Sequence, residues 1–111
     1  MNKKTDGYQT YLATEPIIVN DIEFWEIVIN PECQIKHPDI TDELILELAK
    51  QLDGKKFWGK RGKDNWEYFE FEPLFHKHKA YRLVWCWDEN YSFLGIQNCF
   101  RRKKYEKRDQ I

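Results

Sequence analysis

The chain has 111 residues, of which 41% are hydrophobic and 33% charged, and its formal net charge is −1. This composition is typical of one globular domain and excludes the disordered and fibrous classes of protein. No apolar run reaches about 18 residues and the N-terminal residues lack the apolar stretch of a secretory signal, so we expect a cytoplasmic protein without a membrane partner. Cys33, Cys86 and Cys99 lack the spacing of a disulfide framework or a zinc site. We therefore expect reduced thiols, no metal and no cofactor.

The small net charge hides one acidic and two basic segments. Residues 15–53 contain ten Asp or Glu but only two Lys. Residues 55–63 contain five basic residues and no acid, and residues 101–111 contain six basic residues and two acids. Such an uneven distribution of charge favours an anionic partner for the basic segments.

The N-terminal part of the chain predicts a polar tail and a hairpin. Residues 1–12 are mostly polar, and we expect them to be loose. Residues 15–29 form two apolar runs separated by Asn20 and Asp21, the residue types that tolerate the positive φ of a tight turn. Both faces of the second run are apolar, which indicates a strand covered in part on both sides.

One clear helix is predicted after a loop at residues 30–39. Residues 41–54 repeat apolar side chains at helical spacing, so that a single stripe faces the sheet. Thr41 or Asp39 is suited to the N-cap, and Gly54 is suited to ending the helix.

The C-terminal half predicts a three-stranded meander. A basic loop at residues 55–65 precedes strands at 66–74, 80–88 and 92–100, each with alternating side chains. We therefore predict an α+β fold in which a small antiparallel sheet, made of the hairpin and the meander, packs against one main α-helix. Residues 1–111 form a single domain in this prediction, with loose tails at 1–12 and 106–111.

Alternation assigns the side chains of the meander to two faces. The more apolar face, expected in the core, comprises Phe69, Phe71, Leu83, Trp85, Leu94 and Ile96. The opposite face is expected to collect Tyr68, Glu70, Glu72, Arg82, Gln97 and Arg101. If the last strand continues beyond Phe100, Tyr105 comes within reach of this second face.

Arg82, in the middle of an otherwise apolar strand, has two interpretations. An unpaired arginine is costly to bury, so it either pairs with Glu70 or Glu72 or takes part in an anion site. RNA cleavage without a metal needs a base, a cation for the phosphate and an acid for the leaving oxygen. In the second interpretation the base is Glu70 or Glu72 and the clamp is Arg82 with Arg101 or Arg102. The candidates for the acid are Lys103, Lys104 and Tyr105. The bases of the RNA would stack on Trp66 or Tyr68, beside a basic lip that contains Lys60, Arg61 and Lys63.

The segment "AYRLVWCWDENYSFLGIQNCFRRKKYEK" resembles the C-terminal half of the RelE/HigB/ParE superfamily of bacterial toxins. The matching positions are residues 81–84, 93–96 and 100–105. This resemblance implies a toxin of a toxin–antitoxin pair that cleaves free or ribosome-bound mRNA, with a cognate antitoxin protein as partner. It also implies that Arg82 corresponds to the strand arginine of the superfamily. The stretch "KHPDITDELI" is similar to the broader barnase/EndoU/colicin/RelE-like nuclease group, which makes His37 a secondary candidate beside its plainer role as a loop residue before the helix.

Two further functions remain open from the sequence. One is a non-catalytic module of similar fold that binds nucleic acid or protein through the basic segments 55–63 and 101–108. The other is an immunity or regulatory protein whose acidic segment, residues 15–53, contacts a basic partner.

Overall fold

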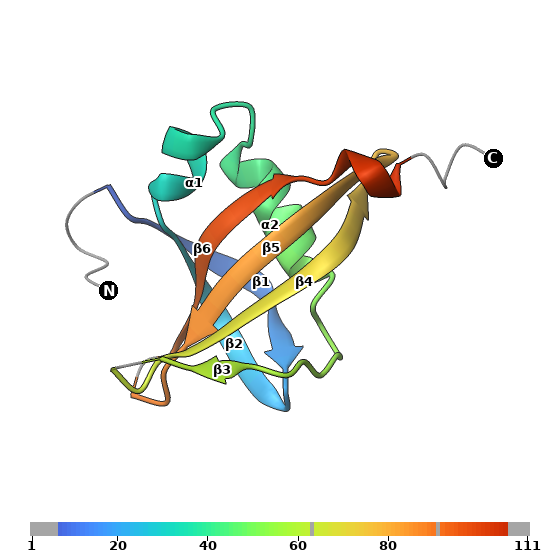
Figure 1. The fold of residues 1–111 in the computed structure, drawn as a ribbon. Coiled ribbons are helices and arrows are strands. Elements are labelled where there is room, and N and C mark those ends of the chain that lie inside the picture. The colour runs from blue at the N-terminus through green and yellow to red at the C-terminus, as the bar shows by residue number, and fades with distance from the viewer. Residues whose placement is uncertain (1–6, 63, 91, 107–111) are drawn as a thin grey trace.

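The computed structural model describes residues 7–62, 64–90 and 92–106 of the chain. They form one mixed sheet of six strands, two α-helices and a short 3₁₀ helix (Figure 1). In chain order the elements are β1 (Gln9–Val19), β2 (Ile22–Ile29), α1 (Glu32–Lys36), α2 (Asp42–Lys50), β3 (Lys60–Arg61), β4 (Glu67–His76), β5 (Lys79–Trp87), β6 (Phe93–Arg101) and η1 (Lys103–Tyr105).

The sheet joins the predicted hairpin and the predicted meander through one parallel pair of strands. Its order is β1-β2-β6-β5-β4-β3, and β2 and β6 run parallel while all other neighbours are antiparallel. The prediction of an antiparallel sheet is therefore wrong at this junction. The helices between β2 and β3 carry the chain across, which allows β6 to return beside β2 in the same direction.

The predicted turn of the N-terminal hairpin is confirmed, but the first strand is longer than predicted. Asn20 and Asp21 have φ angles of 52° and 64°, and a two-residue type I′ hairpin turn requires a positive φ at both residues. However, β1 begins at Gln9, so residues 9–12 belong to the sheet and not to a loose tail. In the middle of β1 four residues, 13–16, lie opposite the single residue Trp25 of β2.

The helical region contains two helices in place of the single predicted one. The short α1 lies within the predicted loop, and five residues are too few to give a periodic sequence signal. The Thr41 side chain caps α2 by accepting a hydrogen bond from the Leu44 N–H at 3.2 Å. Gly54 has a positive φ of 78° but lies beyond the end of α2, where its N–H donates to the Ile18 carbonyl oxygen. No helix in the described ranges is both long and apolar enough to cross a membrane.

The main core contains apolar residues of the sheet and of both helices. Five of the six predicted core residues, Phe69, Leu83, Trp85, Leu94 and Ile96, are buried in it. The sixth, Phe71, is 38% exposed, although its ring contacts Phe57 with a centroid distance of 5.2 Å. The helical residues Ile45, Leu48, Ala49 and Leu52 belong to the same cluster.

A second, smaller apolar cluster contains Val28, Trp66, Cys86 and Phe93. Because Cys86 follows the core residue Trp85 in β5, this cluster lies on the opposite face of the sheet. Trp66 is buried here, so it is not the exposed stacking platform that the sequence suggested. The thiols of all three cysteines are free and buried.

Two β-bulges reset the alternation of side chains near Arg82. In β4, Glu72 and Pro73 together lie opposite Arg82, between the pairs Phe71–Leu83 and Leu74–Tyr81. In β6, Gln97 is an extra residue between the pairs Ile96–Trp85 and Asn98–Val84. One extra residue shifts every following side chain to the other face of the strand.

The bulge at Gln97 overturns the predicted orientation of the end of β6. Cys99 enters the main core, and Phe100 pairs with Arg82 on the opposite face. Arg101 pairs with Tyr81 and so leaves the face on which we had placed it. We use the term outer face for the side of the sheet that carries Tyr68, Glu70, Glu72, Arg82, Val84, Asn98 and Phe100.

Candidate functional site

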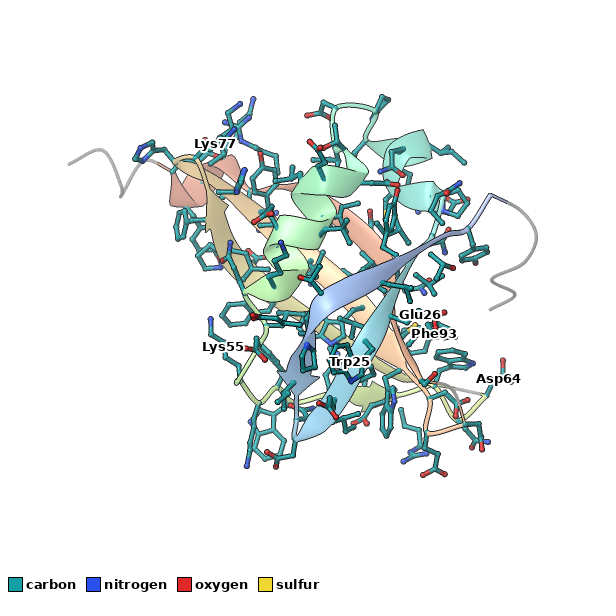
Figure 2. All side chains as sticks on the ribbon, turned by 180° about the vertical axis from the view of Figure 1, so that it is seen from behind. Trp25, Glu26, Lys55, Asp64, Lys77 and Phe93 are labelled. Atoms are coloured by element: carbon teal, nitrogen blue, oxygen red, sulfur yellow. The ribbon has the colours of Figure 1, made fainter. Side chains whose placement is uncertain are left out.

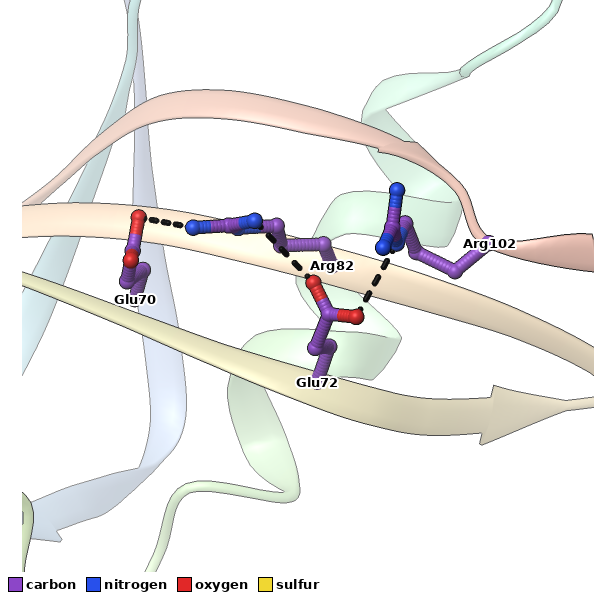
Figure 3. Close-up of polar contacts among 4 residues, drawn as sticks. All are labelled: Glu70, Glu72, Arg82 and Arg102. Atoms are coloured by element: carbon purple, nitrogen blue, oxygen red, sulfur yellow. Dashed lines mark hydrogen bonds and ion pairs between the residues drawn. The ribbon is translucent and has the colours of Figure 1, made fainter. Parts of the chain in front are cut away.

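Arg82 lies at the centre of a charged network on the outer face. Its guanidinium forms an ion pair with Glu70, and its Nη1 donates to Glu72 Oε1 at 3.1 Å (Figure 3). All three side chains come from the neighbouring strands β4 and β5. The pairing of Arg82 with a strand carboxylate, which the sequence left open, is therefore present, and it involves both predicted carboxylates.

Glu72 connects Arg82 to a second arginine, Arg102. Arg102 Nε donates to Glu72 Oε2 at 3.0 Å, so that the two oxygens of one carboxylate hold two guanidinium groups (Figure 3). The Tyr105 hydroxyl lies beside Glu72 and contributes to lowering the pKa of the Glu72 carboxyl. We call Glu70, Glu72, Arg82, Arg102 and Tyr105 the arginine network.

The chain turns immediately after β6 to bring Arg102 and Tyr105 into this network. The Arg102 N–H donates to the Ala80 carbonyl oxygen at 2.8 Å, and residues 103–105 then form η1. The expected continuation of the last strand to Tyr105 is thus wrong, although Tyr105 does reach the outer face. A turn, and not a strand, positions it there.

The network keeps Glu72 ionised. Partial burial alone would raise the pKa of Glu72, but hydrogen bonds from Tyr105 and Arg102 and the charges of both arginines lower it below the ordinary value of 4.5. The hydrogen bond with Glu70, followed by the charges of both carboxylates, raises the pKa of Arg82. A carboxylate with a lowered pKa is a weak base, so Glu72 is better suited to positioning the arginines than to accepting a proton.

His37 reaches the edge of the network through Phe100. The His37 ring stacks on the Phe100 ring with a centroid distance of 5.6 Å and an interplanar angle of 27°. On the same Phe100 ring, the Arg82 Cζ lies 5.8 Å from the centroid. The structure therefore places His37 one aromatic ring away from Arg82. Strict alternation from the core residue Ile96 assigns Phe100 to the core, so the sequence pattern missed this link.

Arg101, a predicted member of the phosphate clamp, belongs to a separate ion pair. Its Nε and Nη2 donate to the two oxygens of Glu106 at 2.6 and 2.7 Å. The Ala80 N–H also donates to Glu106. The hydrogen bonds from Arg101 and Ala80 lower the pKa of Glu106 to about 2. Glu106, which we had placed in the loose C-terminal tail, is thus held by the fold.

The remaining predicted RNA-binding residues are spread around the outer face. Lys60 pairs with Tyr68 across β3 and β4, and both side chains are exposed, as is Arg61. The exposed Lys103 and Lys104 lie in η1, next to the arginine network. Lys63 lies outside the described residues.

The described residues form a shallow depression and a larger groove, which differ in their lining. A shallow depression on the outer face is lined by Glu70, Phe71, Glu72 and Arg82. A larger groove of about 970 Å³ lies between the bulged part of β1, the exposed side of α2 and the β4–β5 turn. Figure 2, which views the molecule from behind, shows α2 and β1 on that side and Lys77 at the turn. The arginine network is adjacent to the shallow depression and not to the groove.

The described residues offer chemistry based on arginines, carboxylates and a phenol. Within these residues, no group of three or more His, Cys, Asp or Glu side chains is arranged to hold a metal ion. Comparison with protein-family models, curated proteins and solved structures gave no match to this chain. The interpretation of the site therefore rests on its own geometry.

Proposed function

We propose that the chain is a metal-independent ribonuclease toxin of a bacterial toxin–antitoxin pair and that RNA binds at the arginine network. The observation that carries this proposal is the placement of Arg82 and Arg102 on either side of one ionised carboxylate, on an exposed face of the sheet. Guanidinium groups in a fixed arrangement suit the recognition of a phosphodiester. The resemblance of residues 81–105 to the RelE/HigB/ParE superfamily agrees with this assignment.

In the proposed reaction Arg82 and Arg102 stabilise the charge that develops on the phosphorus oxygens. Glu72 holds both guanidinium groups in position, so little reorganisation is needed when the phosphate arrives. A phosphate oxygen would replace Glu70 as the partner of Arg82. The other partner, Glu72, is only 16% exposed and stays in place.

Glu70 is the proposed general base. Its side chain is 56% exposed and pairs with Arg82 at the open side of the network. Once a phosphate has displaced it, its carboxylate is available to accept the proton of the ribose 2′-OH. The 2′ oxygen then bonds to phosphorus and the bond from phosphorus to the 5′ oxygen breaks. The products are a 2′,3′-cyclic phosphate and a 5′-hydroxyl end.

The proton for the leaving 5′ oxygen comes from the side of the network formed by η1. The Tyr105 hydroxyl is the best placed donor because it lies beside Glu72, although this contact raises the pKa of Tyr105 and makes it a weaker acid. Tyr105 is therefore protonated at neutral pH. Lys103, Lys104 and His37 are the other candidates, and substitution of each separates them.

The proposal is tested by incubating the purified chain with RNA in EDTA, with and without ribosomes. We expect cleavage that leaves 2′,3′-cyclic phosphate ends. The Glu70→Gln variant should cleave at least about 100-fold more slowly, as is usual on loss of a general base. Glu47→Gln is the matched control, because Glu47 is also an exposed carboxylate in an ion pair, with Lys50 on α2. Absence of cleavage by the folded wild type under both conditions would contradict the proposal.

A second candidate function is a non-catalytic module that binds nucleic acid. The observation that favours it is the internal balance of the network, in which two carboxylates already neutralise Arg82 and Arg102. In this case the exposed lysines around the outer face would supply the affinity. Binding would weaken steeply with salt concentration, because phosphate contacts release counterions. RNA would remain intact, and Glu70→Gln would bind it at least as well as the wild type.

A further inference from the structure

Trp58 is the most exposed large apolar side chain in the described part of the chain, with 99% of its surface accessible. A single exposed aromatic residue is common on protein surfaces and by itself indicates nothing. Three features distinguish Trp58. The backbone on both sides of Trp58 is anchored, and this segment runs beside β4, the strand that carries Glu70. Four basic residues flank Trp58 in the sequence.

The backbone around Trp58 is held from two directions. On the N-terminal side, the Phe57 N–H donates to Asn20 Oδ1 at 2.6 Å, and Asn20 Nδ2 donates to the Phe57 carbonyl oxygen at 3.1 Å. The Phe57 ring packs on Trp85 with a centroid distance of 4.9 Å. On the C-terminal side, Gly59 lies so close to the Phe69 ring that an added Cβ would fall 2.5 Å from it. The start of the predicted basic loop is thus fixed to the turn of the hairpin and to β4.

These contacts place Trp58 alongside β4 near Glu70. Phe57 contacts Phe71 and Gly59 contacts Phe69, so the segment runs antiparallel to β4 with Trp58 between these two contacts. The Phe57 side chain packs against the main core, whereas the Trp58 side chain is 99% exposed. Trp58 therefore projects away from the core.

The chain on either side of Trp58 is basic, although the Lys56 Nζ forms an ion pair with Asp21 Oδ2 at 3.2 Å. Lys55, Lys56, Lys60 and Arg61 are all exposed, and residues 55–61 contain no acid. Lys60 also pairs with the exposed Tyr68 of β4. An exposed indole among cations is the combination that binds single-stranded nucleic acid, because the indole stacks on a base while the cations contact the backbone.

We propose that Trp58 is a stacking platform for a base of single-stranded RNA, next to the phosphate site at Arg82. This inference rests on the proposed function, because it assumes that the RNA bound at the arginine network continues across the outer face to Trp58. Trp58 lies two residues before β3, and β3 and β5 lie on either side of β4, about two inter-strand spacings or 10 Å apart. RNA that contacts Arg82 therefore needs only a short path across β4 to reach Trp58.

The experiment measures the binding of a single-stranded oligoribonucleotide of about 12 residues in which every ribose carries a 2′-O-methyl group. This probe lacks the nucleophile for cleavage, so binding is measured without reaction. We expect Trp58→Ala to weaken binding by about 5- to 100-fold and Trp58→Phe to weaken it much less. The wild type should also show quenching of tryptophan emission that Trp58→Phe lacks. Because Trp58 is almost fully exposed, the urea midpoint of both variants should match that of the wild type.

Trp25→Ala is the matched control, since Trp25 is a half-exposed tryptophan on β2, away from the basic loop that begins at Lys55 (Figure 2). It should bind the probe like the wild type. Equal affinity of Trp58→Ala and wild type would overturn the proposal. So would a Trp58-dependent emission change with vesicles of phosphatidylcholine and phosphatidylserine but not with the probe, which would assign Trp58 to a membrane surface.

A parallel assay with cleavable RNA separates this inference from the proposed function. If the wild type cleaves RNA but Trp58→Ala binds the probe normally, the stacking platform is wrong and the ribonuclease proposal stands. If Trp58→Ala weakens binding but the folded wild type does not cleave RNA, the platform stands and the ribonuclease proposal is wrong.

Discussion

The side chains on the two faces of the sheet are held by different interactions. On the core face, Leu83 and Trp85 of β5 are buried among apolar residues of the strands and helices. On the outer face of the same strand, Arg82 is held by ion pairs to Glu70 and Glu72 above a β-bulge. The comparison shows that regular alternation builds the core and places Glu70, Glu72 and Arg82, whereas the bulge in β6 and the turn after it bring Arg102 and Tyr105 into the network. Substitutions on the core face should therefore affect stability, and substitutions on the outer face should mainly affect function.

Trp85→Ala should give the largest loss of stability. The Trp85 side chain is 1% exposed and contacts the rings of Phe57 and Phe69. Truncation of a buried tryptophan costs about 3–5 kcal/mol because it removes apolar contacts and leaves a cavity. Urea unfolding monitored by circular dichroism would measure this loss. A loss below about 1 kcal/mol would show that the core face is not the main source of stability.

Glu72→Gln should have a smaller but clear effect. The variant removes the negative charge between Arg82 and Arg102, and we expect a loss of about 1–3 kcal/mol in the free energy of unfolding. Glu70→Gln is its matched control on the same strand, because Glu70 is more exposed and pairs with one arginine. We expect that variant to lie within about 0.5 kcal/mol of the wild type. Equal losses in the two variants would contradict the distinction between the positioning carboxylate and the proposed base.

The ion pair between Arg101 and Glu106 should appear as a dependence of stability on acid pH. The pKa of Glu106 is about 2 in the folded protein, below the ordinary carboxyl value of 4.5. Its contribution to stability is therefore complete above pH 4.5 and is lost as the pH falls towards 2. Glu106→Gln should be less stable than the wild type at neutral pH and should lose less stability over this window. Parallel pH profiles for the two proteins would contradict the assignment.

Local features of the fold could be predicted from the sequence because their causes are local. The turn at Asn20 and Asp21 depends on residues that tolerate positive φ, and the cap of α2 depends on the Thr41 hydroxyl. The parallel pairing of β2 with β6 depends instead on contacts between distant segments, which no single strand pattern encodes. For this reason five of the six strands were predicted, β3 being missed within the expected basic loop, and their arrangement was predicted only in part.

The candidate site was predicted in part for a related reason. The network does contain the predicted Glu70, Glu72 and Arg82, since alternation is regular over most of β4 and β5. The bulge at Gln97 then exchanges the faces of Phe100 and Arg101, and nothing in the pattern of apolar residues marks that extra residue. Arg102 therefore occupies the place that we had given to Arg101.

The central claim is that Arg82 is held on the outer face for RNA cleavage and not for folding. The most direct test is the rate of RNA cleavage in EDTA by Arg82→Leu, measured at a temperature where circular dichroism shows the variant to be folded. We predict a rate at least about 100-fold below that of the wild type, as is typical for the loss of a group that stabilises developing charge. Cleavage at the wild-type rate by the folded variant would contradict the claim.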